Sequence, residues 1–523
     1  MPKLHTISFI VTLFLVSTVF GKKTTSVDIC IYGANSGGVI AAYTAQKSGK
    51  SVLLIEPSSN LGGLSTDGLG YTDIGNKYVV KGLSRDFYRR LGTHYGKLEQ
   101  WIFEPSVADG IFNDYVKEAD LNVLYNMRLN KVNKSKNTIQ SIVIENSIKP
   151  SKATNQTISA KIFIDCSYEG DLMARAGASY TIGRESNTLY NETYNGVQLL
   201  DAHQFPDGID PYKEKGNPTS GLLWGISPNP VLPNGTGDKK VQAYNYRICL
   251  TDKPSNKVEI TKPDNYQPEK YELLIRLKEK QPWNSLNDIF IWSMMPNRKT
   301  DINNRGGFST DMIGMNWNYA DASYDERKRI IKEHEDYTKG LLYFVGHDER
   351  IPLKIRNEML KWGYPKDEYI GNSNWSPQLY VREARRLVGE KVMTQHHCQG
   401  KEIVSDPIAW AAYTMDSHNC DRHVVNGMVK NEGNVEVGGF PPYPISYQSL
   451  VPKRKEASNL IVPVCMSASH IAYGSIRMEP VFMVMSQSAA IEACQAIDAK
   501  VGVQDVDANK VLSEQPMLYY LSL

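Results

Sequence analysis

The chain has 523 residues, of which 41% are hydrophobic and 22% are charged, with 59 lysines and arginines against 57 aspartates and glutamates. This composition excludes a disordered chain, a collagen and a protein with many membrane spans. The formal net charge of +2, with no basic block, argues against nucleic acid as a partner, and we expect a small molecule instead.

Residues 1–21 have the pattern of a secretory signal peptide. Lys3 provides a charged start, an apolar run follows to Phe20, and modest or small residues stand at the −3 and −1 positions of a cleavage site near Gly21-Lys22. The apolar run is shorter than the ~20 residues of a membrane-spanning helix. We therefore predict a periplasmic or secreted protein whose mature form has no membrane anchor.

The cysteines do not predict a disulfide framework, because their number is odd and no C-x-x-C pair occurs. They stand at Cys30, Cys166, Cys249, Cys398, Cys420, Cys465 and Cys494. We expect them to be small buried side chains. His396 and His397 precede Cys398, but no second ligand pair follows at a suitable spacing, so the sequence predicts no metal site.

The first regular elements after the signal peptide predict a strand–helix–strand unit. An apolar strand is expected at 27–32, a tight turn at 33–38, an Ala-rich helix at 39–49 and a second strand at 51–56. Such a unit favours an α/β fold with a parallel, doubly wound sheet.

The rest of the chain predicts a meander and then a second domain. Short strands at 122–129, 138–145 and 158–165 are separated by polar turns and predict an antiparallel meander that returns to the sheet. Helices are expected at 325–344 and 381–392, a strand at 459–465 and a last helix at 479–499. The expected organisation is a signal peptide at 1–21, a nucleotide-binding domain at 26–186 and 446–500, a substrate or cap domain at 187–445, and a C-terminal tail at 501–523.

The turn between the first strand and the first helix resembles a dinucleotide-binding G-x-G-x-x-G turn. Gly33 supplies the tight turn and Gly38 the close packing of helix on strand. Asn35 stands where the second glycine is usual, and asparagine tolerates positive φ better than most residues. Ser36 and Gly37 complete the turn, whose helix N-terminus is suited to a pyrophosphate.

Glu56 supports the dinucleotide interpretation over that of a purely structural turn. It follows Gly33 by 23 residues and ends the second strand, where an acidic side chain accepts hydrogen bonds from ribose hydroxyls. A second glycine cluster, Gly62-Gly63-Leu64, comes six residues later. This arrangement resembles FAD proteins of the glutathione-reductase type more than NAD dehydrogenases.

Two later segments extend the resemblance. The run from Phe163 through Asp165 to Gly170-Asp171 resembles the strand and turn that these FAD proteins place over the adenine half of the cofactor. The run from His470 through Gly474-Ser475 to Pro480 opens the last helix, whose N-terminus is suited to negative charge on a reduced flavin.

Together these segments make the chain similar to a large bacterial family of FAD-dependent oxidoreductases, many of them exported. The similarity also includes Tyr244–Arg247, Pro296–Asn304, Tyr380–Arg386, Asp416–His418 and Leu450–Lys453. The resemblance implies FAD as cofactor. It also implies a Rossmann-type FAD-binding domain, with a parallel sheet and an antiparallel meander, and a discontinuous α+β substrate domain.

Four residues are candidates for the chemistry. Histidine is the usual base near neutral pH, and His418, within Asp416-Ser-His-Asn, is the best placed, with His470 as a second candidate. Arg477 is suited to the flavin edge or a substrate oxyanion, and Arg247 to a substrate carboxylate or sulfate. Each has a structural alternative, a hydrogen-bonded histidine or a salt-bridged arginine.

Two further groups of residues carry weaker signals. Arg382, Arg385 and Arg386 have helical spacing and are expected to form one ion-paired helix face. Asn303 and Asn304, with tryptophans at 292, 317 and 375, are suited to a sugar but are also common packing residues.

The resulting hypothesis is an exported FAD-dependent oxidoreductase. It would transfer a hydride from a small polar substrate, such as a carbohydrate derivative, to flavin, and pass the electrons to an acceptor that the sequence does not identify. The alternatives are a redox-silent carbohydrate-binding protein on the same scaffold and an NAD-linked dehydrogenase.

Overall fold

The structure is a computed structural model that describes residues 24–520, so the predicted signal peptide at 1–21 lies outside the described residues. Within that range, no helix combines the length and the apolar character needed to cross a membrane.

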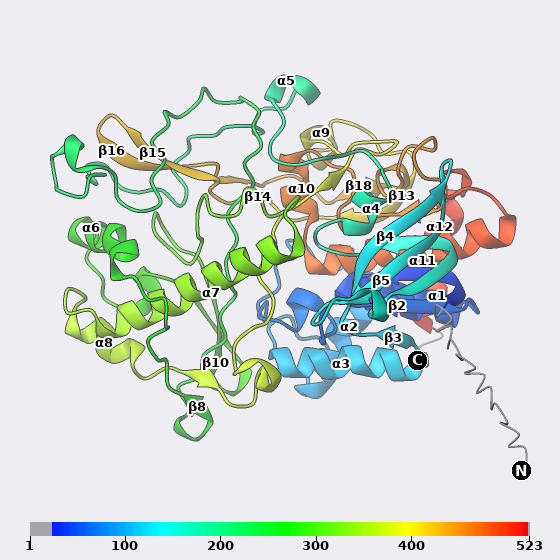
Figure 1. Cartoon of the computed structure of the whole chain (residues 1–523), viewed down its shortest axis with the longest axis horizontal. Helices are drawn as coiled ribbons and strands as arrows, with labels where there is room; N and C mark the ends of the chain where they lie inside the picture. The colour runs from blue at the N-terminus through cyan, green and yellow to red at the C-terminus, as the bar shows by residue number, and fades with distance from the viewer. Residues whose placement is uncertain (1–23, 521–523) are drawn as a thin grey trace, which may run out of the picture.

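A seven-stranded sheet forms one lobe of the described chain, on the right in Figure 1. Its strands are β1 (Thr24–Tyr32), β2 (Val52–Ile55), β3 (Asn122–Leu124), β4 (Met127–Ser135), β5 (Thr138–Asn146), β6 (Gln156–Asp165) and β19 (Leu460–Ile461). The order is β3-β2-β1-β6-β5-β4, with β19 also beside β6. β3, β2, β1, β6 and β19 are parallel, whereas β4 and β5 are antiparallel. The predicted parallel sheet with an antiparallel meander is thus confirmed.

The side chains at the end of β1, Ile29–Tyr32, are apolar without interruption and alternate between the two faces of the sheet. Ile29 and Ile31 belong to the cluster that contains the apolar side chains of α1 and α11. Cys30 and Tyr32 belong to a second cluster with the side chains of β4 and β5. Both faces of the strand are therefore buried, as in other parallel sheets that are covered on both sides.

Four helices lie on the first of these faces: α1 (Ser36–Lys47), α2 (Gly82–His94), α3 (Pro105–Glu118) and α11 (Glu479–Ala499). α1 packs directly on α11, and Gly37 permits the contact because a Cβ there would lie 2.4 Å from Ser486 Oγ. α12 (Ala508–Tyr520) contacts α2 and α11, so part of the predicted tail is a packed helix. The other domain boundaries stay predictions.

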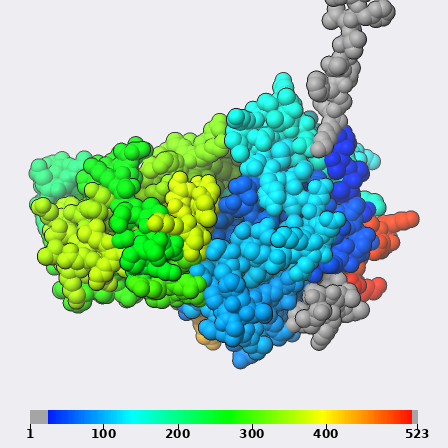
Figure 2. Space-filling view, turned by 90° about the horizontal axis from the view of Figure 1, so that it is seen from below, coloured from blue at the N-terminus to red at the C-terminus, as the bar shows by residue number. Residues whose placement is uncertain are grey.

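The middle of the chain forms the second lobe. Its longer elements are α6 (Glu272–Lys280), α7 (Tyr324–His347), α8 (Leu353–Met359) and the hairpins β9 (Ile291–Met295)/β10 (Lys299–Asn303) and β15 (Asp421–Val425)/β16 (Met428–Glu432). Two more strand pairs are β14 (Met415–Ser417)/β17 (Val435–Val437) and β13 (Pro407–Ala411)/β18 (Tyr443–Ser446), of which the second packs on α11 and α12 of the first lobe. Figure 2 shows the green and yellow residues of this lobe at one end of the molecule and the blue N-terminal residues at the other.

The remaining helices and strands of the described chain are short. They are α4 (Asp171–Arg175), β7 (Tyr180–Thr181), α5 (Asn187–Tyr190), β8 (Lys257–Val258), β11 (Tyr364–Pro365), β12 (Arg386–Leu387), α9 (Gln395–Cys398) and α10 (His470–Ile476).

All seven cysteines are buried and free, as expected for small apolar side chains.

Three predictions about local structure were wrong. The strand expected at 122–129 is two strands, because Asn126 has a φ of 55° and turns the chain. The strand expected at 459–465 is reduced to β19. The helix expected at 381–392 is an extended segment containing β12.

The extended segment places its three arginines against acids from different parts of the chain. The ion pairs are Arg382 with Asp311, Arg385 with Asp171 and Asp321, and Arg386 with Glu185 and Glu383. All three guanidinium groups are buried. A helix would have placed the three arginines on one face. In the extended segment each arginine reaches its own acidic partners, which the helical spacing of the residues does not predict.

Candidate active site

Gly33 and Gly38 have the positions expected of the first and third glycines of the turn. Gly33 has a φ of 94°, and a Cβ there would lie 2.8 Å from the backbone nitrogen of Ser167. A Cβ on Gly38 would lie 1.9 Å from the carbonyl oxygen of Gly33. Neither position has room for a side chain, so the close approach of β1, α1 and β6 depends on both.

Asn35 does not replace the second glycine in the way we expected. Its φ is −65°, outside the positive region, and its side-chain oxygen accepts a hydrogen bond from the Gly38 N–H at 2.9 Å. It is the N-cap of α1, a position that asparagine favours. The missing space is supplied by Gly63 in the facing turn, where a Cβ would lie 2.7 Å from Asn35 Cβ.

The second glycine turn is built around Tyr168. Gly62 and Gly63 have φ values of 82° and 53°, and a Cβ on Gly63 would lie 2.5 Å from the Tyr168 hydroxyl. The Leu64 N–H donates a hydrogen bond to the same hydroxyl oxygen at 3.0 Å. The predicted pair of glycines thus allows two distant turns to lie in contact.

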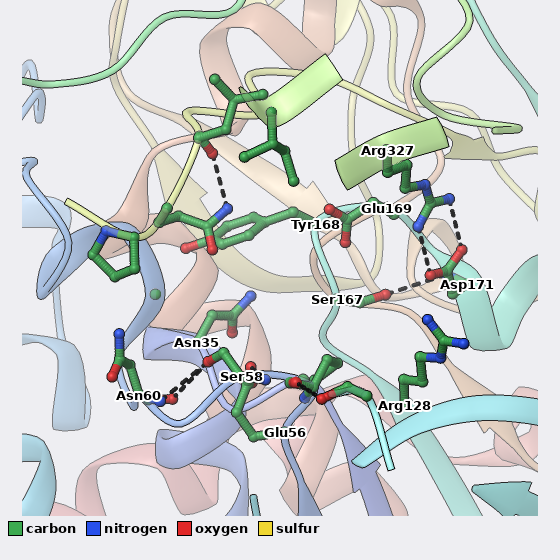
Figure 3. Close-up of a pocket in the computed structure, with 18 of the residues that line it drawn as sticks. Asn35, Glu56, Ser58, Asn60, Arg128, Ser167, Tyr168, Glu169, Asp171 and Arg327 are labelled. Atoms are coloured by element: carbon green, nitrogen blue, oxygen red, sulfur yellow. Dashed lines mark hydrogen bonds and ion pairs between the residues drawn. The ribbon is translucent and has the colours of Figure 1, made fainter. Parts of the chain in front are cut away.

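A cavity of about 290 Å³, which we call the Glu56 cavity, lies between these turns and the second lobe (Figure 3). Glu56, Ser58 and Asn60 are on one side of it, and Tyr168, Glu169 and Arg327 on the other. Its remaining lining residues include Tyr32, Gly33, Asn35, Gly63, Asp67, Arg128, Ser167, Asp171, Tyr319, Tyr324 and Leu379.

Glu56 is held by backbone donors at the end of β2. Its two carboxylate oxygens accept hydrogen bonds from the Ala34 N–H at 2.7 Å and the Ser58 N–H at 2.8 Å. Burial raises the pKa of Glu56, and these hydrogen bonds oppose the rise. Each oxygen retains a second lone pair, so the carboxylate can still accept hydrogen bonds from a diol in the cavity.

The cofactor-binding residues that were predicted at the end of β6 and in the turn after it mostly contact other parts of the protein. Asp165 does not line the cavity, because its carboxylate accepts hydrogen bonds from Ser167 and from the Met173 N–H in its own turn. Gly170 is the left-handed N-cap of α4. Asp171 lines the cavity, but Arg327 of α7 binds it through two hydrogen bonds, at 2.7 and 2.9 Å, and joins the lobes.

Gly474 and Ser475 also differ from the prediction. A Cβ on Gly474 would lie 2.6 Å from the carbonyl oxygen of Asp416, so this glycine allows α10 to pack on β14. The Ser475 hydroxyl donates a hydrogen bond to the Tyr413 carbonyl and accepts one from Tyr443 at 2.6 Å. Among the described residues, neither of these two lines the Glu56 cavity or the cavity around His418.

A second cavity, of about 420 Å³, is lined by three of the four residues that were predicted to take part in the reaction. We call it the His418 cavity. It is lined by Tyr71, Asp73, His203, Arg247, Ile291, Ser293, Asn303, Asn304, Tyr380, Tyr413, Thr414, Asp416, His418, Asn434, Glu436, Arg477 and Met478. Leu379 of the Glu56 cavity and Tyr380 of the His418 cavity are neighbours in the chain, so one loop borders both.

His418 is oriented by a buried carboxylate. Its Nδ1 lies 2.8 Å from Asp311 Oδ2, and its Nε2 lies 3.9 Å from Asp416 Oδ2. Burial lowers the pKa of His418, as does Arg382, while Asp311 and Asp416 oppose the shift. When the Nδ1–H donates a hydrogen bond to Asp311, Nε2 is left as the basic nitrogen. This is the arrangement of an oriented general base.

The two predicted arginines are already paired. Arg247 binds Asp301 through two hydrogen bonds, at 2.8 and 2.5 Å, and its Nη1 lies 3.9 Å from Asp73. Arg477 donates hydrogen bonds to the Tyr380 hydroxyl at 3.2 Å and to the carbonyl oxygen of Asp416 at 3.1 Å. Asp301 occupies the fork of Arg247, so this arginine does not offer the free carboxylate clamp that we expected.

His470 lies outside both cavities. Its Nδ1 is 2.7 Å from Glu383, and its Nε2 is 3.0 Å from the Ser417 hydroxyl. His470 is 1% exposed, and Glu383 and Ser417 are fully buried. The network supports β14, which carries Asp416 and precedes His418, so His470 has the position of a hydrogen-bonded structural histidine, the alternative that its sequence left open.

Several groups at these cavities were not predicted from the sequence. Asp311, which orients His418, is 107 residues away from it, and no local pattern links the two. His203 lines the His418 cavity and lies 3.3 Å from Glu436. Glu479 lies between the glycine turns, and its position as a buried acid in the first turn of α11 was the available signal. Among the described residues, no group of three or more His, Cys, Asp or Glu is arranged as a metal site.

The Glu56 cavity fits part of a dinucleotide. Gly33, Gly63 and Asn35, the N-cap of α1, line it, and a carboxylate suited to a diol lies at the end of β2. These features are those of a parallel sheet that binds a nucleotide at the carboxyl ends of its strands.

Comparisons with known proteins agree with this fit. The sequence profile of a family described as FAD dependent oxidoreductase matches residues 28–514. No functionally curated protein is significantly similar in sequence.

Parts of the chain are similar to solved structures. OxyS, an anhydrotetracycline hydroxylase from Streptomyces rimosus, is 9% identical over 35% of this chain and 36% of that one, with a TM-score of 0.25. A flavoprotein/dehydrogenase from Cytophaga hutchinsonii is 16% identical over 29% and 42%, with a TM-score of 0.24. A 3-ketosteroid-Δ4-(5α)-dehydrogenase from Rhodococcus jostii is 14% identical over 31% and 50%, with a TM-score of 0.21. The aligned segments span half or less of each of these structures. The family match covers most of the chain, and the chain therefore belongs to the FAD dependent oxidoreductase family.

Proposed function

We propose that this protein is an exported enzyme, with a glutathione-reductase-type FAD site, that oxidises a small polyhydroxylated substrate in the His418 cavity by hydride transfer to flavin. FAD is its cofactor, as the family match establishes. The observation that carries the proposal is the position of an oriented histidine in a polar cavity whose wall continues into the Glu56 cavity.

FAD would be held mainly by the first lobe. The N-terminus of α1 and the Gly63 turn are suited to the pyrophosphate, and Glu56 is suited to the ribose hydroxyls. When bound, FAD supplies the hydride acceptor at flavin N5.

His418 would act as the base for the substrate hydroxyl. Oxidation of an alcohol removes a hydride from carbon and a proton from oxygen, so a proton acceptor is needed beside the substrate. The lowered pKa keeps the imidazole of His418 neutral at pH 7, and Asp311 stabilises the positive charge that forms when Nε2 takes the proton. Arg477 lines the same cavity, and its guanidinium would favour the developing negative charge on the substrate oxygen.

The lining of the His418 cavity supports a neutral polyhydroxylated substrate. Each hydroxyl of such a molecule both donates and accepts hydrogen bonds. The wall offers carboxylate acceptors (Asp73, Asp416, Glu436) and donors on arginine and asparagine side chains (Arg247, Arg477, Asn303, Asn304, Asn434), with tyrosines between them (Tyr71, Tyr380, Tyr413). Asp301 already occupies the fork of Arg247, and the wall carries three carboxylates against two arginines, so its charge disfavours an anionic substrate.

Purification of the mature protein tests the proposal against its two alternatives. We expect a yellow protein whose flavin absorbance is bleached under anaerobic conditions by at least one neutral sugar or polyol. Sugar binding without bleaching would favour the redox-silent binding protein, and a colourless protein that takes up NAD but not FAD would favour the NAD-linked dehydrogenase. N-terminal sequencing of the exported protein tests cleavage near Gly21-Lys22.

A further inference from the structure

A buried carboxylate joins three distant segments next to the Glu56 cavity. Glu479, in the first turn of α11, is 3% exposed. Its Oε1 accepts a hydrogen bond from the Tyr168 hydroxyl at 2.7 Å, and its Oε2 accepts hydrogen bonds from Ser65 Oγ at 3.2 Å and from Ser36 Oγ. Among the described residues, no Lys, Arg or His forms an ion pair with it.

The three donors belong to the segments that surround the Glu56 cavity. Ser36 is the first residue of α1, Ser65 ends the short helical turn Gly63–Ser65, and Tyr168 follows β6. Tyr168 itself lines the cavity. Asn35, which precedes Ser36, and Gly63, which begins the turn that Ser65 ends, line it as well.

Glu479 also adjoins the His418 cavity. Arg477 and Met478, the two residues before it, line that cavity. Glu479 therefore follows two residues of the His418 cavity in the chain, while its carboxylate contacts Tyr168 of the Glu56 cavity.

The chemistry of the cluster shows that the carboxylate organises its neighbours. Three hydroxyl donors converge on one acid, and the ionised form can accept from all of them. The Tyr168 hydroxyl in turn accepts the Leu64 N–H, which extends the network into the second glycine turn. Burial raises the pKa of Glu479, and the hydroxyl groups of Ser36, Tyr168 and Ser65 lower it.

We propose that Glu479 is a positioning residue that fixes the N-terminus of α1, the Gly63 turn and the Tyr168 turn in the arrangement that binds FAD. Affinity for FAD then depends on this carboxylate beyond its effect on the stability of the fold. The inference rests on the proposed assignment of the Glu56 cavity to the cofactor.

The test measures FAD release from diluted holoenzyme through the fluorescence of free FAD. Glu479→Ala is expected to raise the dissociation constant for FAD about 10-fold or more, since it removes one acceptor shared by three donors. Glu479→Gln keeps an acceptor for two of the donors and should fall between wild type and Glu479→Ala. The matched control is Glu492→Ala, because Glu492 is a 1% exposed acid of the same helix that lines neither cavity.

Smaller variants keep the test decisive if Glu479→Ala does not fold. Ser65→Ala and Tyr168→Phe each remove one donor and should raise the dissociation constant about threefold, while the melting temperature of the FAD-free protein changes no more than in Glu492→Ala. Wild-type affinity in both of these variants, or an equal loss in Glu492→Ala, would overturn the proposal.

Glu56→Ala separates this inference from the cavity assignment. If Glu56→Ala weakens FAD binding and the Glu479 variants do not, only the positioning role fails. If none of these variants affects FAD binding, the assignment of the Glu56 cavity fails as well.

Discussion

The two cavities are built in different ways. The Glu56 cavity is built on two glycine turns, the N-terminus of α1 and the carboxyl ends of β1, β2 and β6, and side chains such as Arg128 and Arg327 complete its wall. The His418 cavity is formed by side chains from loops and short strands, held by contacts such as Asp301 with Arg247 and Asp311 with His418. One methyl group should therefore disrupt the first cavity, whereas the second should tolerate side-chain changes that alter its chemistry.

The largest effect is expected from Gly38→Ala. The added Cβ would lie 1.9 Å from the Gly33 carbonyl oxygen, a backbone atom that cannot move without displacing β1. We expect loss of bound FAD and destabilisation by about 3 kcal/mol, measured by absorbance and by denaturant unfolding. Gly110→Ala in α3 is the control, because no atom lies within 4 Å of a Cβ there. Full FAD occupancy in Gly38→Ala would show that the turn is not the binding element.

His418→Gln should retain FAD and lose turnover. Removal of the base is expected to lower kcat by roughly 10²- to 10⁴-fold, measured by flavin reduction in single-turnover experiments. The exposed His94 at the end of α2 provides the control His94→Gln, which should behave as wild type. A His418→Gln enzyme that is as fast as wild type would show that His418 is not the base.

Asp311→Asn should change both rate and pH dependence. In wild type, activity should rise with pH through one ionisation below about 6.5, because burial lowers the pKa of His418. The Asp311 carboxylate favours the protonated imidazole, so its removal should move this acid limb to lower pH. Loss of the preferred tautomer should also lower kcat by about 10- to 100-fold. An unchanged pH profile would contradict the coupling of the two residues.

The smallest effect is expected from Asp73→Asn. Asp73 lines the His418 cavity and lies 3.9 Å from Arg247, so it can accept a hydrogen bond from a substrate hydroxyl. We expect KM to rise a few-fold while kcat stays within twofold. Asp207→Asn, at an exposed acid paired with Lys430 outside both cavities, is the matched control. A drop in kcat without a change in KM would place Asp73 in the chemistry instead of in binding.

The same difference between the two cavities explains which parts of the site could be predicted from the sequence. Gly33, Gly38 and Glu56 belong to one strand–helix–strand unit, where spacing along the chain determines position in space. Asp311 and His418 meet only through the fold of the second lobe, so spacing carries no information about their contact. Gly474 shows the limit of a local pattern, because a glycine that allows a ligand to approach and one that allows another backbone segment to approach look alike in sequence.

The measurement that tests the central claim most directly is anaerobic flavin reduction by a panel of neutral sugars and polyols, in wild type and in His418→Gln with equal FAD content. The account predicts that at least one polyol bleaches the wild-type flavin and that His418→Gln reacts at least about 100-fold more slowly. A substrate that bleaches both proteins at the same rate, or wild-type holoenzyme that no polyol reduces, would contradict it.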